Sequence, residues 1–100
     1  MNEFKIIINP FAEQDIREAK NWYDDKQENL GSELLQEIHL TLNHVKANPF
    51  IFQEVKKNIR RTFLKRFPYA LFYSVHKSTV TVFAVFHFSR NPGIWKERKA

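Results

Sequence analysis

The sequence predicts an α+β protein in which a helical hairpin packs on one face of a curved antiparallel sheet. Two observations lead to this prediction. Between residues 10 and 48, apolar side chains recur at helical spacing in two segments that QENLGS separates. From Phe50 onward the pattern becomes that of strands, with segments rich in β-branched and aromatic residues. A short apolar run near the N-terminus adds one more strand, so the predicted order is β-α-α-β-β-β.

The first strand and the two helices follow from local signals. FKIII, residues 4–8, is a short β-branched run typical of a strand. Asn9 followed by Pro10 predicts a helix N-terminus, because Asn caps free N–H groups and Pro is tolerated in the first turn. The first helix is expected to run to about Lys26. The second helix ends before Pro49, because the residue that precedes a proline avoids the α conformation. Its apolar face consists of Leu34, Ile38, Leu42 and Val45.

Three consecutive antiparallel strands are expected at residues 59–67, 69–76 and 79–87. Pro68 separates the first two, and the HKS segment makes a tight turn between the second and third. Because side chains alternate between the faces of a strand, each strand divides into two sets. The sets expected to share a face are Tyr69, Leu71, Tyr73 and Val75; Val80, Val82, Ala84 and Phe86; Arg61, Phe63 and Lys65; and Arg60, Thr62, Leu64 and Arg66. Helices cover only one face, so some of these cations are expected on the open face, beside His87 and Arg90.

The composition is that of one domain spanning residues 1–100. Hydrophobic residues make up 43% and charged residues 27% of the 100 residues, as in ordinary globular domains. The absence of cysteine excludes disulfides, thiolate metal sites and a cysteine nucleophile, and it fits a reducing cytoplasm. No apolar run approaches the roughly 20 residues that span a membrane. The sequence therefore predicts a cytoplasmic protein without a membrane partner.

Charge is divided unevenly between the two halves. Residues 1–50 hold five Lys and Arg against nine Asp and Glu, a net charge of −4. Residues 51–100 hold eleven against two, a net charge of +9. A strongly basic half favours an anionic partner, which includes nucleic acid, an acidic protein and a membrane surface.

Three segments in this order resemble the RelE/ParE superfamily of bacterial type II toxins. They are NLGSELLQEIHLTLNHVKANPFIF, IRRTFLKRFPYALFYSV and VTVFAVFHFSRNPGIW, which together span nearly the whole chain. The most specific parts, RR…KRFPYALFY and AVFH…RNP…W, look like the ParE branch more than the RelE branch. The resemblance implies a helical hairpin on an antiparallel sheet, and a toxin neutralised by a cognate acidic antitoxin in a hetero-oligomeric complex. No cofactor and no metal are expected.

Two targets remain open within the superfamily. ParE-like members are linked to inhibition of DNA gyrase, whereas RelE-like members cleave mRNA on the ribosome. In the nuclease, Arg61 or Lys65 would hold phosphate, His87 would act as acid or base, and Arg90 would stabilise the transition state. RelE-like nucleases commonly carry an Arg directly after the central-strand Tyr, and this chain has Ala70 there. Gyrase inhibition is therefore ranked first, with endoribonuclease activity as the alternative that would make the chain an enzyme.

The residues expected to form the target-binding surface are Arg61, Lys65, His87, Arg90 and Trp95. The structural interpretation of His87 is a hydrogen-bonded residue at a strand end, and that of Trp95 is an anchor for the tail. A third hypothesis is a nucleic-acid-binding module without catalysis, in which bases stack on sheet aromatics. The aromatics considered for this role are Phe63, Phe67, Phe72 and Phe83.

Overall fold

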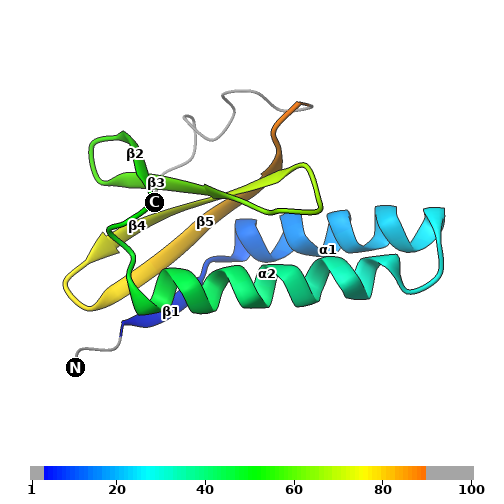
Figure 1. The fold of residues 1–100 in the computed structure, drawn as a ribbon, viewed down its shortest axis with the longest axis horizontal. Helices are drawn as coiled ribbons and strands as arrows, with labels where there is room; N and C mark the ends of the chain where they lie inside the picture. The colour runs from blue at the N-terminus through cyan, green and yellow to red at the C-terminus, as the bar shows by residue number, and fades with distance from the viewer. Residues whose placement is uncertain (1–3, 90–100) are drawn as a thin grey trace.

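The computed structural model describes residues 4–89. It contains one five-stranded sheet and two helices, in the order β1(Lys5–Ile8), α1(Pro10–Lys26), α2(Leu30–Ala47), β2(Gln53–Lys56), β3(Ile59–Phe63), β4(Tyr69–His76) and β5(Thr79–His87). Figure 1 shows the two helices side by side along the sheet, with their connection projecting beyond it. The α+β class and the predicted succession of a strand, two helices and further strands are confirmed.

The sheet differs from the expectation in three details. Its order is β1-β5-β4-β3-β2, and β1 pairs with β5 in parallel, so the sheet is mixed. The short strand β2 was not predicted, because Gln53–Lys56 is a polar edge segment without a β-branched run. It pairs with β3 in an antiparallel hairpin. The strand expected at residues 59–67 ends at Phe63.

Side-chain acceptors stabilise the start of each helix of the hairpin. Asn9 Oδ1 accepts the N–H of Ala12 at 2.9 Å, as its position before Pro10 predicts. The start of α2 is capped from the neighbouring helix, because Asp24 Oδ1 of α1 accepts the N–H of Gly31 at 2.8 Å. The sequence therefore supplies one cap locally and the other through the packing of the two helices.

Buried side chains form two cores, one on each face of the sheet. The core between sheet and helices contains Leu34, Ile38 and Val45 of α2, with Tyr69, Leu71, Tyr73, Val75, Val80, Val82 and Val85. The core on the opposite face consists of Ala70, Phe72, Phe83, Ala84 and Phe86, against which Val55 and Ile59 pack. The β4 residues predicted to share a face do share one, and the structure shows that this face packs against the helices.

The prediction that Ala84 and Phe86 share a face with Val80 and Val82 is wrong. Phe72 pairs with Ala84 and Tyr73 pairs with Val82, which leaves Phe83 as an extra residue in β5. Such a bulge shifts the alternation by one residue. Beyond it, Val85 faces the helices, and Ala84 and Phe86 face the second core.

An acidic side chain from α1 supports β5 beyond the bulge. Parallel pairing with β1 ends at Val82, so the outer edge of β5 has no strand partner after this point. Asp15 Oδ2 accepts the N–H of Val85 at 3.0 Å. Because an unpaired N–H beside a core is costly, this contact fixes both the register of β5 and the position of α1.

Candidate functional site

The cations of residues 60–66 have different surroundings, and Arg60 is structural. Its Nη1 donates to the carbonyls of Phe50 at 3.1 Å and Phe52 at 2.7 Å, and its guanidinium lies 5.3 Å from the ring of Phe50. Arg60 pairs across the sheet with Tyr73, on the helix-facing side. These contacts fasten the connection between α2 and β2, so Arg60 does not belong to an open face.

Arg61 lies on the opposite face of the sheet. It pairs with Phe72, which belongs to the second core, and directly opposed residues of antiparallel strands point to the same face. Its Nη2 donates to Gln53 Oε1 at 2.9 Å, and its guanidinium lies 4.8 Å from the ring centre of Phe63. Its buried Nε has no hydrogen-bond partner among residues 4–89. Arg61 is thus a cation held against an aromatic ring on the face away from the helices.

A groove runs between α2 and the outer edge of β3. Its volume is about 420 Å3, and its lining residues are Glu33, Gln36, Glu37, Leu40, Thr41, His44, Phe52, Thr62, Phe63, Lys65 and Arg66. The α2 members recur every three or four residues, so they form one stripe of the helix. β2 pairs with β3 only as far as Arg61, so the β3 edge at Thr62 and Phe63 has no β2 partner. Within residues 4–89 the groove therefore combines a helix face with a strand edge that has no paired strand.

The walls of the groove expose apolar surface. Leu40 is 59% exposed and Phe63 is 48% exposed, although both are large hydrophobic side chains. Phe63 contacts Phe88 edge-on, with 5.5 Å between the ring centroids. Exposed apolar side chains that line one concave surface are typical of interaction sites, whereas scattered ones need no explanation.

The loop between β3 and β4 places Lys65 and Arg66 at the groove. The Glu37 carboxylate accepts the backbone N–H groups of both residues, with 3.0 Å to the N–H of Arg66. The Arg66 guanidinium forms an ion pair with Glu33 at 2.6 Å, and this hydrogen bond raises the pKa of Arg66 above its ordinary value. Acceptors on α2 therefore end strand β3 earlier than predicted and turn the loop toward the helix.

The Lys65 ammonium is available to a binding partner, whereas the Arg66 guanidinium is paired with Glu33. The backbone N–H of Lys65 is bound by Glu37, while no ion pair or hydrogen bond of its ammonium occurs among residues 4–89. It is exposed and lines the groove beside Phe63. The groove thus offers apolar surface together with one free ammonium, a pattern that fits a segment with apolar side chains and a carboxylate.

His87 lies on the face opposite to Arg61. It pairs with Tyr69 of the helix-facing core, and the two rings are 5.3 Å apart. Its Nδ1 accepts the N–H of Ser89 at 3.2 Å. The bulge at Phe83 places His87 on this face, because it reverses the facing of every later residue of β5. The expectation that His87 shares an open face with Arg61 is therefore not met.

The other sequence-predicted site residues, Arg90 and Trp95, lie outside the described residues. Of the aromatics considered for base stacking, Phe67, Phe72 and Phe83 are 5% exposed or less, and Phe63 is exposed. Within residues 4–89 no three His, Cys, Asp or Glu side chains are placed to hold a metal ion. No described helix is long and apolar enough to cross a membrane.

Sequence reasoning missed the α2 side of the groove. Glu33, Glu37 and Leu40 lie on a second stripe of α2, next to the apolar face that packs on the sheet. The available signal was Leu40, an apolar residue outside the predicted buried face. The role of Glu37 had no local signal, because it depends on a loop 28 residues further along the chain.

Comparison with known proteins identifies a matching family and a similar fold. The model of the family described as the ParE toxin of the type II toxin–antitoxin system parDE matches residues 6–92. A solved structure described as the chromosomal ParDE TA system from P. aeruginosa has a similar fold, with a TM-score of 0.74 and 11% sequence identity. The similarity covers 83% of this chain and 94% of that chain. No curated protein matches the sequence.

Proposed function

The chain belongs to the ParE toxin family, and on this basis we propose that it is a toxin that inhibits DNA gyrase and that a cognate acidic antitoxin neutralises it. The toxin acts in the cytoplasm, and the inhibited state is a hetero-oligomer of toxin and antitoxin. The single observation that carries the choice of gyrase over mRNA is the separation of Arg61 from His87 on opposite faces of the sheet.

Cleavage of RNA needs these groups together. A general acid or base must lie within hydrogen-bond reach of the reacting oxygen, while cations contact the same phosphate. Arg61 and His87 cannot both reach one phosphate through the sheet, so of the two cations considered for the phosphate only Lys65 could act with His87. Ala70 is a second objection to the nuclease, because RelE-like nucleases commonly carry an Arg at this position. Ala70 is 1% exposed within the second core, where a cation would be buried among aromatic rings. The alternative of a ribosome-dependent mRNA endonuclease therefore has less support.

The target is tested by pulse labelling of DNA and protein synthesis directly after the chain is expressed in a bacterium without antitoxin. We expect DNA synthesis to fall first. In parallel, purified chain should inhibit supercoiling of relaxed plasmid by purified gyrase. An earlier fall of protein synthesis, with gyrase unaffected, would favour the nuclease and refute gyrase inhibition.

The groove beside α2 is the proposed binding site of the antitoxin. Its apolar side chains and the Lys65 ammonium fit an acidic segment, and the uncovered edge of β3 accepts an extended one. The variant Leu40→Ser should weaken antitoxin binding measured by calorimetry. Ile51→Ser is the matched control, because Ile51 is also exposed, at 66%, and does not line the groove. Equal losses in the two variants would exclude the groove.

Contact of Arg61, Lys65, His87, Arg90 and Trp95 with the target stays a prediction, and Arg61 and His87 would make it from opposite faces of the sheet. Arg61 is tested by Arg61→Glu, scored as growth inhibition in the absence of antitoxin. Arg17→Glu is the control, because Arg17 is an exposed cation of α1 and the change of net charge is the same. We expect toxicity to be lost only in Arg61→Glu. A fully toxic and folded Arg61→Glu protein would remove Arg61 from the target surface.

A further inference from the structure

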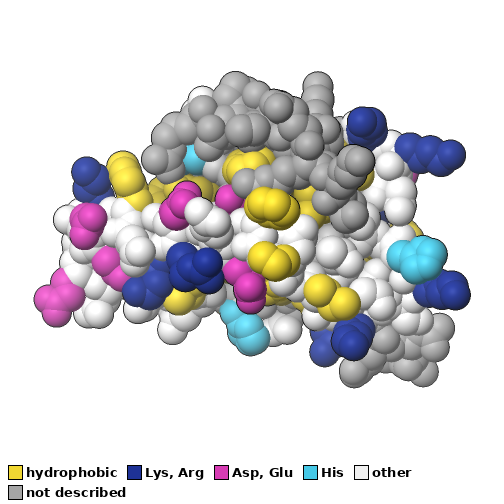
Figure 2. All heavy atoms as spheres, turned by 180° about the vertical axis from the view of Figure 1, so that it is seen from behind, with side chains coloured by type: hydrophobic (Ala, Val, Ile, Leu, Met, Phe, Trp, Pro, Cys, Tyr) yellow, Lys and Arg dark blue, Asp and Glu magenta, His cyan; other side chains and the backbone are white. Residues whose placement is uncertain are grey.

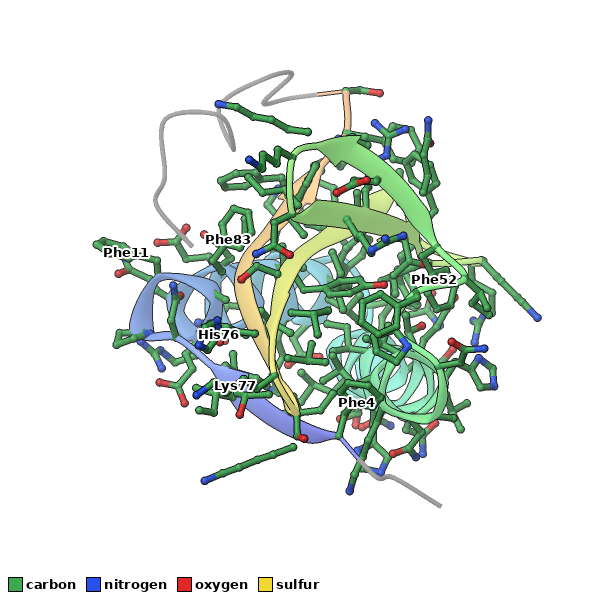
Figure 3. All side chains as sticks on the ribbon, turned by 90° about the vertical axis from the view of Figure 1, so that its left-hand side faces the viewer. Phe4, Phe11, Phe52, His76, Lys77 and Phe83 are labelled. Carbon is green, nitrogen blue, oxygen red and sulfur yellow. The ribbon has the colours of Figure 1, made fainter. Side chains whose placement is uncertain are left out.

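Two tight turns and the first strand meet at one end of the sheet. Residues 57–58 connect β2 to β3, and residues 77–78 connect β4 to β5. Because β3 and β4 are antiparallel, the start of β3 lies beside the end of β4, and both turns are at the same end. β1 begins there too, since the N–H of Lys5 donates to the carbonyl of Ser78 at 2.8 Å. Figure 3 looks onto this end, where His76 and Lys77 are labelled.

This end of the sheet carries four exposed lysines, namely Lys5, Lys56, Lys57 and Lys77, and the exposed His76. We call these five residues the basic end. Figure 2 shows dark-blue side chains and one histidine along it, on the right of the view. The salt bridges within residues 4–89 are Lys20–Asp24 and Arg66–Glu33, so none of the four lysines has an ion-pair partner in the described part of the chain.

Acidic side chains are nearly absent from this region. Every described Asp and Glu lies on α1, on α2 or in their connection, except Glu54 of β2. The Glu54 carboxylate accepts the N–H of Asn58 at 2.8 Å, so it stabilises the turn between β2 and β3. Four lysines and one glutamate give this end a net charge of +3 with His76 neutral. The local field therefore attracts anions.

The lysines lie in tight turns and at strand ends that extend across the width of the sheet. Asn58 and Lys77 have left-handed backbone conformations, with φ of 59° and 55°, so each of the two turns contains one such residue. Neighbouring strands are about 4.8 Å apart, so the five strands place cations over a width of roughly 19 Å. Duplex DNA carries one negative charge per about 1.7 Å of its axis, so roughly eleven phosphate charges lie within that width.

We propose that the basic end binds the phosphate backbone of duplex DNA without reading its sequence. Lysine suits this role, because its ammonium is a flexible point charge that contacts phosphate oxygens singly. An acidic protein is the less suitable partner, because the core of a protein interface is apolar. None of the exposed large hydrophobic side chains in the described residues belongs to segments 54–58 or 76–79; the exposed Phe50 borders this end near Lys5, where its ring contacts that of Phe4 at 5.8 Å. This binding goes beyond gyrase inhibition and needs neither gyrase nor antitoxin.

The test is fluorescence anisotropy of a labelled 20-base-pair duplex titrated with the full chain between 50 and 200 mM salt. Contact with four phosphates predicts that log K falls with log salt with a slope of about −3.6. Lys57→Gln/Lys77→Asn removes two contacts, and Asn suits the left-handed position of Lys77. Its slope should be shallower by about 1.8, and its affinity about 60-fold lower at 0.1 M salt.

Arg17→Gln/Lys26→Gln is the matched control, because it removes two exposed cations of α1 and keeps the turns unchanged. It should bind like the parent, and a duplex of different sequence should bind equally well. Equal weakening in both double variants, or no binding at 50 mM salt, would overturn the proposal. Tighter binding of a poly-glutamate peptide of matched charge would also overturn it, in favour of an acidic protein. Toxicity and gyrase inhibition are measured in separate assays. A failure to bind DNA therefore overturns this proposal alone and does not affect the proposal of gyrase inhibition.

Discussion

Replacement of Glu37 should weaken the fold at the groove, whereas replacement of Glu33 should not. Both glutamates lie on the same stripe of α2, one helical turn apart. The Glu37 carboxylate accepts two backbone N–H groups, those of Lys65 and Arg66. Within residues 4–89 the Glu33 carboxylate contacts only the exposed side chain of Arg66. The pair of variants Glu37→Ala and Glu33→Ala therefore compares a backbone anchor with a surface ion pair.

The expected magnitude follows from the geometry. Hydrogen bonds to a charged group contribute about 1.5–3 kcal/mol each when buried. These N–H groups are at the surface, where water replaces the carboxylate, so the loss resembles removal of a helix cap, about 1–2 kcal/mol. In a chain of this length that loss lowers Tm by about 5–10 °C. Glu33→Ala should leave the free energy of unfolding nearly unchanged, because exposed ion pairs contribute little. Any gain in helix propensity from alanine is the same in both variants.

The assay is urea unfolding of both variants, with amide hydrogen exchange as a local readout. In Glu37→Ala the N–H groups of Lys65 and Arg66 should exchange faster, and in Glu33→Ala they should exchange as in the parent. A loss of stability in Glu33→Ala that equals or exceeds that in Glu37→Ala would refute the assignment of Glu37 as the anchor of this loop. Exchange rates unchanged in both variants would refute it as well.

Three further predictions concern the cores and the hairpin. Tyr73→Phe should lower stability by about 1–3 kcal/mol in urea unfolding, because the buried carbonyl of Pro49 loses the Tyr73 hydroxyl that donates to it at 2.6 Å. Burial also raises the pKa of Tyr73 to about 12. The parent should therefore show no tyrosinate absorbance from Tyr73 at pH 10. Gly31→Ala should cost about 1–3 kcal/mol, since an added Cβ would lie 2.5 Å from the Lys20 carbonyl oxygen, and an unchanged Tm would contradict this. The hydrogen bonds from Lys20 and from the Gly31 N–H lower the pKa of Asp24. The stabilisation of the fold by ionised Asp24 is therefore complete above about pH 4 and disappears as the pH falls through the lowered pKa. Thermal scans from pH 7 to 2.5 should show that Tm depends less on acid in Asp24→Asn than in the parent.

The local elements could be predicted because their signals lie within a few residues of each other. Asn9 caps α1 three residues later, and Pro49 ends α2 where the sequence indicates. The division of β4 into two faces follows from simple alternation, and the set Tyr69, Leu71, Tyr73 and Val75 was correctly predicted to share a face. The family resemblance likewise depended on the order of residues in the chain and on no tertiary contact.

The sequence by itself thus determined the element types, their order, the charge asymmetry and the family. The tertiary structure decided where the functional side chains lie. The bulge at Phe83 reversed the face on which His87 lies. The Glu37 carboxylate holds the Lys65 loop at the groove by a hydrogen bond between residues 28 positions apart in the chain. The contact of Asp15 with Val85 spans 70 residues. Periodicity and capping arise from neighbours along the chain, whereas bulges, edge pairing and a shared basic end depend on segments that meet only after folding.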